Sequence, residues 1–476
     1  MLMRIGGVDT EPGNDTWIPV INPATGEEID RVPAGTKDDV ERAVAAADTA
    51  FFLWKKKTQR ERGMILFRTA GIVREQHKDL ARLLTREQGK PLRESIDEIR
   101  GYANILEFYA GISGAQNGEL VRLGANGDAL VTREPLGICG AIIPWNMPVL
   151  IMGWKVGPAL LAGNTLILKP ASSTPLTTIR LAQILEDAGL PPGTLNVVTG
   201  PGETVGEAMA GHKAIKKLSF TGNCTTGRRI RELAAGSLKE LTLELGGSDP
   251  MIVMPDADID NAVDGAIRGR FYNAGQTCTA VKRLLVHESI AREFSHRLKL
   301  KTETLKLGNG LDTGTDMGPL NSAIQRERIE KLVDKVHETG EGTVLTGGIR
   351  PGGAEYSRGF FYRPTVVSDV VKTSGLLTGE VFGPVLPVVP VPDLDTAITE
   401  ANGTPYGLGA SIWTSNLHTA KRAFDEIHAG IIWVNRHLTV PPEIPFGGMN
   451  ESGLGRENGL HALESYSRTK TMLLGW

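Results

Sequence analysis

The chain has 476 residues, a hydrophobic content of 41% and a charged content of 22%, which are ordinary values for a globular protein of two or three domains. Its formal net charge of −3 supplies no excess of positive charge, which argues against a nucleic-acid partner. The apolar stretch 147–161 is interrupted by glycine, lysine and proline, and it is shorter than the about 20 residues that a membrane span needs. Three cysteines without paired spacing predict no disulfide framework and no bound metal. We therefore expect a cytoplasmic protein with no membrane segment.

The first third of the chain is predicted to be helical. Residues 38–54 repeat apolar side chains at helical spacing, and Asp38 and Asp39 suit the first turn of a helix. A second helical pattern runs from about residue 59 to 87, and a third begins at about residue 92. The segment 129–135 then has the character of a strand.

Short apolar segments of strand length, each followed by a helical pattern, come next. The predicted strands are 137–144, 165–170, 195–200, 216–222 and 240–247, with helices at 149–161, 177–189, from about 204 and from about 226. This alternation predicts βαβ units and a parallel sheet, in which ligands bind beyond the carboxyl ends of the strands. The fold class is therefore α/β.

A second alternating region begins near residue 251, after a predicted boundary at 247–250. It includes apolar segments at 250–254, 283–287, 343–348, 380–391 and 411–415, and helices at 259–273 and about 292–305. The last segment, 467–476, reads as a strand with little core of its own. We expect it to pair with 129–135 or with another subunit.

The three cysteines lie in different settings. Cys139 lies inside an apolar strand and is interpreted as a small core residue, and Cys224 follows a glycine turn where packing is favoured over ligand contact. Cys278 lies among small and polar residues and is predicted near the start of a helix, where N–H groups would lower the pKa of its thiol. These local features leave both an inert thiol and a nucleophile open.

Polar side chains also follow the predicted strands. Glu244 ends an apolar strand before two glycines, where poor solvation would raise the pKa of its carboxyl toward the range of a general base. Asn146 follows the first parallel strand and could donate to an oxyanion, and Lys169 ends the next one. On local grounds alone, Glu244 could equally be a solvated strand end.

Taken together, the motifs resemble the aldehyde dehydrogenase superfamily, of the NAD(P)-dependent, non-acylating type. In order along 20–476 they are PWN (144–146), WKVGPALLAGN (154–164), LKPAS (168–172), SFTG (219–222), LELGG (243–247), NAGQTC (273–278), EVFGP (380–384), VN (434–435) and PFGG (445–448) followed by SGLGRE (452–457). The resemblance implies a Rossmann-like NAD(P)-binding domain, an α/β catalytic domain and a β oligomerisation arm. The implied ranges are 1–118 and 137–247 for the first, 248–446 for the second, and 119–136 and 460–476 for the arm.

The resemblance assigns catalytic roles to matching positions. Cys278 resembles the nucleophile that forms a thiohemiacetal and then a thioester, and Asn146 with the backbone N–H of Cys278 resembles the oxyanion hole. Glu244 resembles the base that activates water for hydrolysis of the thioester. Lys155 and Glu457 match positions linked to proton relay from that glutamate. Because the arm pairs between subunits in this family, a homodimer or homotetramer is implied.

The resemblance also assigns residues to the cofactor. Glu380 and Phe382 resemble contacts to the nicotinamide ribose and ring, and Lys169 and Ser172 resemble contacts to the adenine ribose. The full predicted set is Ile142, Pro144, Trp145, Lys169, Ser172, Gly202, Phe220, Thr221, Gly222, Asn223, Leu245, Glu380 and Phe382. Ser172 stands where NAD-preferring members often carry a glutamate, so NAD and NADP are both expected to serve, with NADP slightly favoured. Two positions depart from the family pattern, namely Asn223 for a serine and Asn450 for a lysine.

Two aromatic residues bear on the substrate. Trp154 and Tyr272 stand where succinate-semialdehyde dehydrogenases carry arginines, so we expect an uncharged aliphatic or aromatic aldehyde, or a small hydroxyaldehyde such as lactaldehyde. Thr277 and Thr279 complete the predicted substrate-binding set. A polar contact from Arg436 or His437 is an alternative that would suit a semialdehyde. The aromatic residues would also attract the quaternary ammonium of betaine aldehyde.

Three other functions remain as alternatives. A CoA-acylating dehydrogenase would use the same cysteine but transfer the acyl group to CoA, whereas Glu244 favours water as the acceptor. A cysteine hydrolase needs a histidine base, and no histidine lies near Cys278 in the sequence. A structural relative without activity would be expected to lack the cysteine or the glutamate. The sequence leaves open the physiological aldehyde, the strict cofactor preference and the choice between dimer and tetramer.

Overall fold

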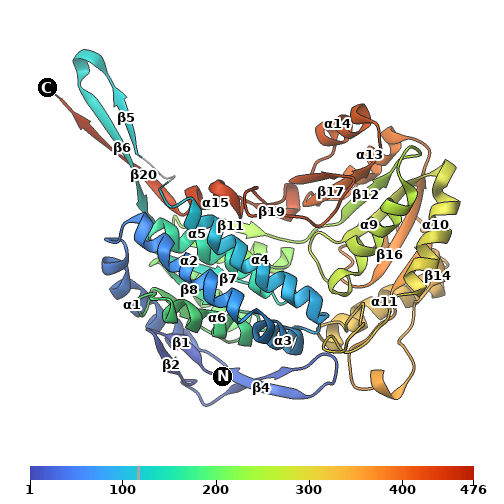
Figure 1. Cartoon of the computed structure of the whole chain (residues 1–476), viewed down its shortest axis with the longest axis horizontal. Helices are drawn as coiled ribbons and strands as arrows, with labels where there is room; N and C mark the ends of the chain where they lie inside the picture. The colour runs from blue at the N-terminus through green and yellow to red at the C-terminus, as the bar shows by residue number, and fades with distance from the viewer. Residues whose placement is uncertain (115–117, 476) are drawn as a thin grey trace.

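Two mixed β-sheets of eight and seven strands organise the chain, and a three-stranded sheet projects from the body of the molecule (Figure 1). The computed structural model describes residues 1–114 and 118–475. The predicted ranges 1–118 and 460–476 therefore include residues 115–117 and 476, which lie outside the described part of the chain.

The N-terminal helices begin where the sequence offers capping residues. Thr36 caps α1 (Lys37–Trp54) in a reciprocal pairing with Asp39, and Thr58 caps α2 (Gln59–Glu75) in the same way. The single helical pattern predicted over 59–87 is wrong in one respect. The backbone of Gln76 (φ −92°, ψ 9°) leaves the helical region, so the pattern forms two helices, α2 and α3 (His77–Gln88). The fourth helix, α4, spans Leu92–Gly111.

The first sheet confirms the predicted parallel alternation. Its order is β19-β11-β10-β7-β8-β9-β1-β2, and the five predicted strands run parallel at its centre. The strands are β7 (Ile138–Ile142), β8 (Thr165–Lys169), β9 (Leu195–Val197), β10 (Ile215–Thr221) and β11 (Glu240–Glu244), with β1 (Met3–Ile5), β2 (Val8–Thr10) and β19 (Gly453–Leu454) at the edges. The connections are α5 (Pro148–Ala162), α6 (Leu176–Asp187), a π-helical turn (Gly202–Gly206) continued by α7 (Glu207–Gly211), and α8 (Cys224–Ala234).

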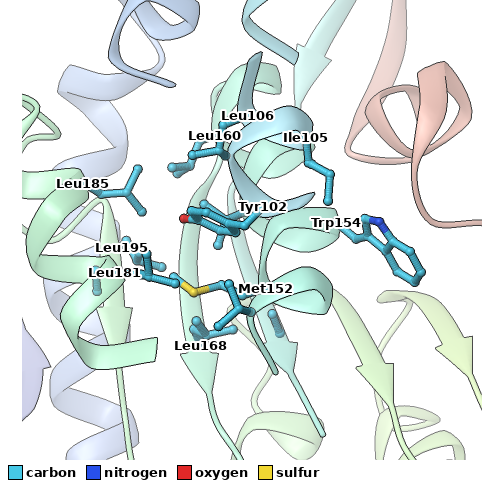
Figure 2. Packing of buried hydrophobic residues seen from close by; sticks show 14 of the residues in the cluster. Tyr102, Ile105, Leu106, Met152, Trp154, Leu160, Leu168, Leu181, Leu185 and Leu195 are labelled. Carbon is cyan, nitrogen blue, oxygen red and sulfur yellow. The ribbon is translucent and has the colours of Figure 1, made fainter. Parts of the chain in front are cut away.

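The central helix of this part is α5, which is buried along nearly its whole length between the sheet and α4. Gly157 is required there because a Cβ at this position would overlap the ring of Tyr109. In Figure 2, Tyr102 of α4 lies among Met152, Leu160 and neighbouring leucines, whereas the Trp154 indole points away from that group. One face of α5 thus builds the core and another presents Trp154 elsewhere.

The second sheet is a further α/β layer of order β14-β15-β16-β13-β12-β17-β18, parallel except for β14. Its strands are β12 (Asp249–Val253), β13 (Val281–His287), β14 (Thr343–Thr346), β15 (Thr365–Ser368), β16 (Val385–Val391), β17 (Gly409–Trp413) and β18 (Ile431–Val434). Its helices are α9 (Ile259–Phe271), α10 (Glu288–Glu303), α11 (Ala323–Thr339), α12 (Gly375–Thr378), α13 (Leu394–Asn402) and α14 (Leu417–Glu426). The segment 380–391 becomes a strand only from Val385, which leaves Glu380 and Phe382 in the preceding loop.

The C-terminal strand has a partner within the same chain. After α15 (Gly459–Ser465), β20 (Ser467–Leu474) pairs antiparallel with β6 (Asp128–Pro135), which in turn pairs with β5 (Glu119–Arg122). This confirms the predicted pairing with 129–135. A separate hairpin joins β3 (Trp17–Ile21) and β4 (Glu28–Pro33). Across residues 1–114 and 118–475, every helix is too short or too polar to cross a membrane.

Candidate active site

The carboxyl edge of the first sheet brings the predicted residues together. In the strand register Ile142 lies beside Lys169 on one side and Phe220 on the other, and Thr221 lies beside Glu244. The segments that follow these strands carry the rest of the predicted set on this sheet. They contain Pro144, Trp145, Asn146, Ser172, Gly202, Gly222, Asn223 and Leu245. The sheet topology thus places these positions along one edge, as expected for a ligand site.

Cys278 approaches this edge from the second sheet, but it does not begin a helix. The chain leaves α9, passes through three consecutive left-handed residues (Asn273, Ala274 and Gly275, φ between 51° and 73°), and reaches Cys278 in a turn before β13. A Cβ on Gly275 would overlap the carbonyl of Gly383, so only glycine fits. The prediction that Cys278 lies near a helix start is therefore wrong.

The predicted lowering of the thiol pKa by a helix N-terminus is wrong for the same reason. Burial raises the pKa of Cys278 to about 12, and the buried Lys282 ammonium acts in the opposite direction. The carboxyl groups of Asp249, Glu244 and Glu380 also raise it. Formation of a thiolate at this site therefore depends on positive charge and hydrogen-bond donors placed close to the sulfur.

Asn146 is held by its backbone, which leaves its side chain available. Its carbonyl accepts hydrogen bonds from Lys90 Nζ (2.7 Å) and Asn273 Nδ2 (2.9 Å). Within residues 1–114 and 118–475, neither the Asn146 amide group nor the backbone N–H of Cys278 has a hydrogen-bond acceptor. Two unengaged donors near a thiol are what an oxyanion requires.

Glu244 is buried at the end of β11, and neither of its carboxyl oxygens has a hydrogen-bond partner among the described residues. Burial raises the pKa of Glu244 well above its usual value, and Glu457 adds to this effect, while Lys155 and Arg456 oppose it. Gly447 gives the carboxyl group its space, because a Cβ there would lie 2.6 Å from Glu244 Oε1. A raised pKa makes the carboxylate form of such a group a stronger base, which can accept a proton from water once it is deprotonated.

Lys155 and Glu457 form a fully buried ion pair, with 2.8 Å between Nζ and Oε1. Ser219 of β10 contacts both members, since its hydroxyl accepts from Lys155 Nζ (2.6 Å) and donates to Glu457 Oε1. The second oxygen of Glu457 has no partner among the described residues. The ion pair and the Ser219 hydroxyl therefore link α5, β10 and the segment after β19.

The apolar side of the site is built from both parts of the molecule. The Trp154 ring lies 4.9 Å from the Phe446 ring, and Tyr272 and Cys278 pack against the same apolar cluster. Tyr272 also lines a hollow of about 410 Å³ between α4 and α9, whose charged lining has both signs: Arg93, Glu94, Asp97, Arg268 and Asp316.

The four remaining residues considered for substrate contact differ in outcome. Thr277 and Thr279 flank Cys278 and are both buried. His437 is wrong as a polar substrate contact, because both of its ring nitrogens are bonded, to Ser411 Oγ (2.9 Å) and to the Thr279 carbonyl (2.7 Å). Arg436 is exposed.

The arrangement fits a dinucleotide. Trp145 and Phe382, from the two parts of the chain, make an edge-to-face contact at 5.4 Å, and Glu380 Oε1 accepts from the backbone N–H of Gly247 (3.2 Å). Lys169 is buried, with a pKa lowered to about 8 by burial, and its Nζ contacts only the Pro170 carbonyl among described residues.

Ser172 and Asn223 already make hydrogen bonds of their own. Ser172 donates to the Gly200 carbonyl (3.1 Å), which leaves its hydroxyl oxygen able to accept. Asn223 replaces the family's serine as the cap of α8, since its Oδ1 accepts from the backbone N–H of Thr226 (2.8 Å). The α8 N-terminus therefore stays formed and directed at the sheet edge, where an anion is favoured.

The residues predicted from the sequence do not include the buried polar residues that support the segments of the site. Lys90 also pairs with Glu98 (2.6 Å), whose other oxygen accepts from the backbone N–H groups of Val149 and Leu150 at the start of α5. Asn273 is a further omission. The sequence gives little indication of the role of Lys90, because a lysine two residues after a helix is usually interpreted as a surface residue.

Parallel strands that converge on one edge, a cysteine from a second α/β layer and a fit for a dinucleotide define an α/β oxidoreductase. The family model described as "Aldehyde dehydrogenase family" matches residues 10–472. A betaine aldehyde dehydrogenase of Rhizobium etli (strain CIAT 652) is 42% identical over 99% of this chain and 96% of its own length. The chain belongs to the aldehyde dehydrogenase family and is an aldehyde dehydrogenase.

Solved structures agree over the whole length. PnpE in complex with nicotinamide adenine dinucleotide superposes with a TM-score of 0.98 at 38% identity, over 100% of this chain and 97% of that one. An Escherichia coli enzyme described as NADP dependent superposes with a TM-score of 0.97 at 36% identity, over 100% and 98%.

Proposed function

We propose that the protein oxidises an aldehyde to the carboxylic acid through a covalent intermediate on Cys278. The observation that carries the proposal is the convergence of three groups on one sheet edge. These are the Cys278 thiol, the unengaged donors of Asn146 and the Cys278 backbone, and the unpaired Glu244 carboxyl. They are the nucleophile, the oxyanion donors and the base that this oxidation needs.

In the proposed first step, the Cys278 thiolate attacks the aldehyde carbon and forms a thiohemiacetal. The Asn146 amide and the Cys278 backbone N–H donate to the oxygen that becomes negative. A nicotinamide bound here would supply the acceptor for the hydride of this carbon. Collapse of the oxyanion then leaves a thioester on Cys278. Trp145 and Phe382, which make an edge-to-face contact, are the residues that would border the nicotinamide ring.

In the proposed second step, Glu244 takes a proton from water, and the resulting hydroxide attacks the thioester carbon. The carboxylic acid leaves and the thiolate of Cys278 is restored. The proton on Glu244 then passes toward the Lys155–Glu457 pair, whose free oxygen, Glu457 Oε2, has no partner among the described residues. Water as the acyl acceptor separates this reaction from the CoA-acylating alternative.

The proposed preference between NAD and NADP depends on the side chain of Ser172. A serine hydroxyl that already donates to the Gly200 carbonyl brings no negative charge to the adenine ribose. Neither a 2′-hydroxyl nor a 2′-phosphate would be repelled, and the Lys169 ammonium nearby would favour the phosphate. We expect both cofactors to serve, with NADP slightly favoured.

The proposed substrate is an uncharged aliphatic or aromatic aldehyde, or a small hydroxyaldehyde such as lactaldehyde. The support is the apolar wall of Trp154, Phe446 and Tyr272 beside Cys278, with no arginine at the positions that bind a carboxylate tail. Betaine aldehyde is the second candidate. It is favoured by the Rhizobium etli relative and by the aromatic rings of Trp154 and Tyr272, which would attract a quaternary ammonium.

The test is the growth of reduced-nicotinamide absorbance with NAD or NADP and a panel of aldehydes that differ in charge and length. Wild type should respond without CoA, and Cys278→Ala should be silent while keeping its fold by circular dichroism. A turnover that requires CoA, or activity of Cys278→Ala, would reject the proposal. Turnover of betaine aldehyde above that of every neutral aldehyde would replace the proposed substrate with the second candidate.

A further inference from the structure

Lys282 lies on β13, and its side chain is buried directly behind Cys278. Its Nζ donates hydrogen bonds to the backbone carbonyls of Cys278 and of Thr277, the latter at 3.3 Å. The next carbonyl, that of Thr279, accepts from His437 Nε2 at 2.7 Å. Three successive carbonyls of this loop therefore accept hydrogen bonds from buried side chains.

His437 is a neutral donor in this arrangement. Burial lowers the pKa of His437 to about 4, and a carbonyl can only accept, so the proton lies on Nε2 and Nδ1 accepts from Ser411. Because the carbonyls point toward Lys282 and His437, the backbone N–H of Cys278 is left without an acceptor among the described residues. The hydrogen bonds from Lys282 and His437 to these carbonyls thus fix the orientation of the Cys278 N–H.

Two carboxyl groups favour the charged form of Lys282 against the effect of its burial. Glu380 Oε1 lies 3.9 Å from its Nζ, and Asp249 on β12 is buried, which raises the pKa of its carboxyl group to about 7. Burial lowers the pKa of Lys282, and Arg270 of α9 lowers it further, whereas Glu380 and Asp249 raise it. An ammonium with two carbonyl acceptors and two facing carboxyl groups is favoured over a neutral amine.

The charge on Lys282 bears directly on the thiol. Burial raises the pKa of Cys278, and the carboxyl groups of Asp249, Glu244 and Glu380 act in the same direction. Lys282 acts against all of them. Since Cys278 is not at a helix N-terminus, the positive charge that a reactive thiolate needs is supplied here by a side chain on the adjoining strand.

We propose that Lys282 is a positioning residue for the nucleophile. It fixes the carbonyls of Thr277 and Cys278 so that the Cys278 N–H faces the substrate, and its charge favours the thiolate. The proposal rests on the proposed role of Cys278 and adds the residue that makes its thiol reactive.

The test follows the thiol directly, without turnover. Alkylation of Cys278 in the full-length enzyme by iodoacetamide is measured from about pH 6 to about pH 10, with the modified peptide quantified by mass spectrometry. For Lys282→Met we expect alkylation about tenfold slower at each pH in this range, which displaces the rate profile by about one pH unit in the alkaline direction. Lys282→Arg keeps the charge and should restore most of the rate.

Lys282→Gln separates charge from hydrogen bonding, because its amide can still donate to a carbonyl. It should show the alkaline shift of the methionine variant, with better thermal stability. An alkylation profile of Lys282→Gln equal to that of wild type would overturn the proposal. The same conclusion would follow if Lys282→Arg reacted as slowly as the glutamine variant.

Arg283 provides a matched control. It is the next residue on β13 and also a buried cation, but its guanidinium donates to the carbonyls of Ser248, Glu400 and Ala401, away from Cys278. Arg283→Met should lose stability and keep the wild-type alkylation profile. A shift as large as that of Lys282→Met would show a general effect of buried charge and reject the specific role.

The outcome is separable from that of the proposed function. If Cys278→Ala retains dehydrogenase activity, the proposed nucleophile fails, yet the alkylation profiles still decide whether Lys282 controls the thiol. If Cys278→Ala is silent and the profiles of the Lys282 variants match wild type, the reaction stands and the role of Lys282 fails.

Discussion

The side-chain amide of Asn273 donates a hydrogen bond of 2.9 Å to the backbone carbonyl of Asn146. This contact joins the loop before Cys278 to the segment after β7, and so it joins the two parts of the molecule that must meet for catalysis. Asn273 is itself fixed, because Gln88 Nε2 donates to its side-chain oxygen and Glu94 accepts from its backbone N–H. This buried amide, together with Lys90, therefore helps to fix the separation of the proposed nucleophile and the proposed oxyanion donor.

Removal of that amide should slow acylation. We expect Asn273→Ala to lower kcat/KM by about tenfold to a hundredfold, because misplacement of a positioned group costs rate of this order. Alanine also strains the left-handed backbone at this position (φ 51°), so Asn273→Gly is the informative companion. Pre-steady-state formation of reduced nicotinamide measures acylation. Wild-type rates in Asn273→Gly would show that the amide does not set the site.

Glu244→Gln should separate the two halves of the reaction. The variant keeps the shape of the side chain but cannot accept a proton from water, so the first turnover should proceed and hydrolysis of the thioester should fall by about 10²–10⁴-fold. The signal is a burst of reduced nicotinamide close to one equivalent per site, followed by slow turnover, with the acyl-enzyme visible by intact-mass spectrometry. Normal steady-state turnover would remove Glu244 from its proposed role.

The sequence predicts the parts of this molecule that depend on local periodicity. The parallel strands of the first sheet and the residues at their carboxyl ends are found where predicted, because apolar runs bounded by glycine are a local signal. The turn at Cys278 is not local in origin. It follows from three left-handed residues closed by the Gly383 carbonyl, a contact across more than a hundred positions.

For a related reason, His437 was predicted as a substrate contact and Lys282 was not predicted at all. A lysine or histidine is read from sequence as a solvated or substrate-facing group, and only tertiary burial makes it a partner of backbone carbonyls. The break at Gln76 is similar, since the helical pattern continues through it while the backbone does not.

Glu457→Gln should move the pH dependence of hydrolysis. The Glu457 carboxyl raises the pKa of Glu244, whereas Lys155 lowers it. Loss of the negative charge, with Lys155 left in place, lowers the pKa of Glu244, so its deprotonated and active form appears at lower pH. The rise of the hydrolysis rate with pH should therefore shift toward acid. Ser219→Ala keeps both charges of the buried pair and should leave the profile in place. An alkaline shift in Glu457→Gln would contradict this sign.

Ser172→Glu should change the cofactor preference. A carboxylate beside the adenine ribose repels a 2′-phosphate, so kcat/KM with NADP should fall by at least about tenfold relative to that with NAD. Ser172→Gln has a similar size without the charge, and it should change the ratio much less. Kinetics with both cofactors at one ionic strength measure the effect. Equal changes in the two variants would attribute the preference to size, and a wild type that strongly prefers NAD would reject the proposed starting point.

The surface of the sheet formed by β5, β6 and β20 indicates that the protein forms an oligomer. Several of its residues are apolar and exposed, with exposed fractions of 55% for Leu120, 51% for Met472 and 72% for Leu473, and such residues are typical of a surface covered in an oligomer. We expect wild type to sediment as a homodimer or homotetramer, and Met472→Glu/Leu473→Glu to form smaller species. Leu417→Glu, on α14, alters an equally exposed leucine outside this sheet (84%) and should keep the wild-type mass. A monomeric wild type in analytical ultracentrifugation would contradict the prediction, as would an unchanged mass for the double variant.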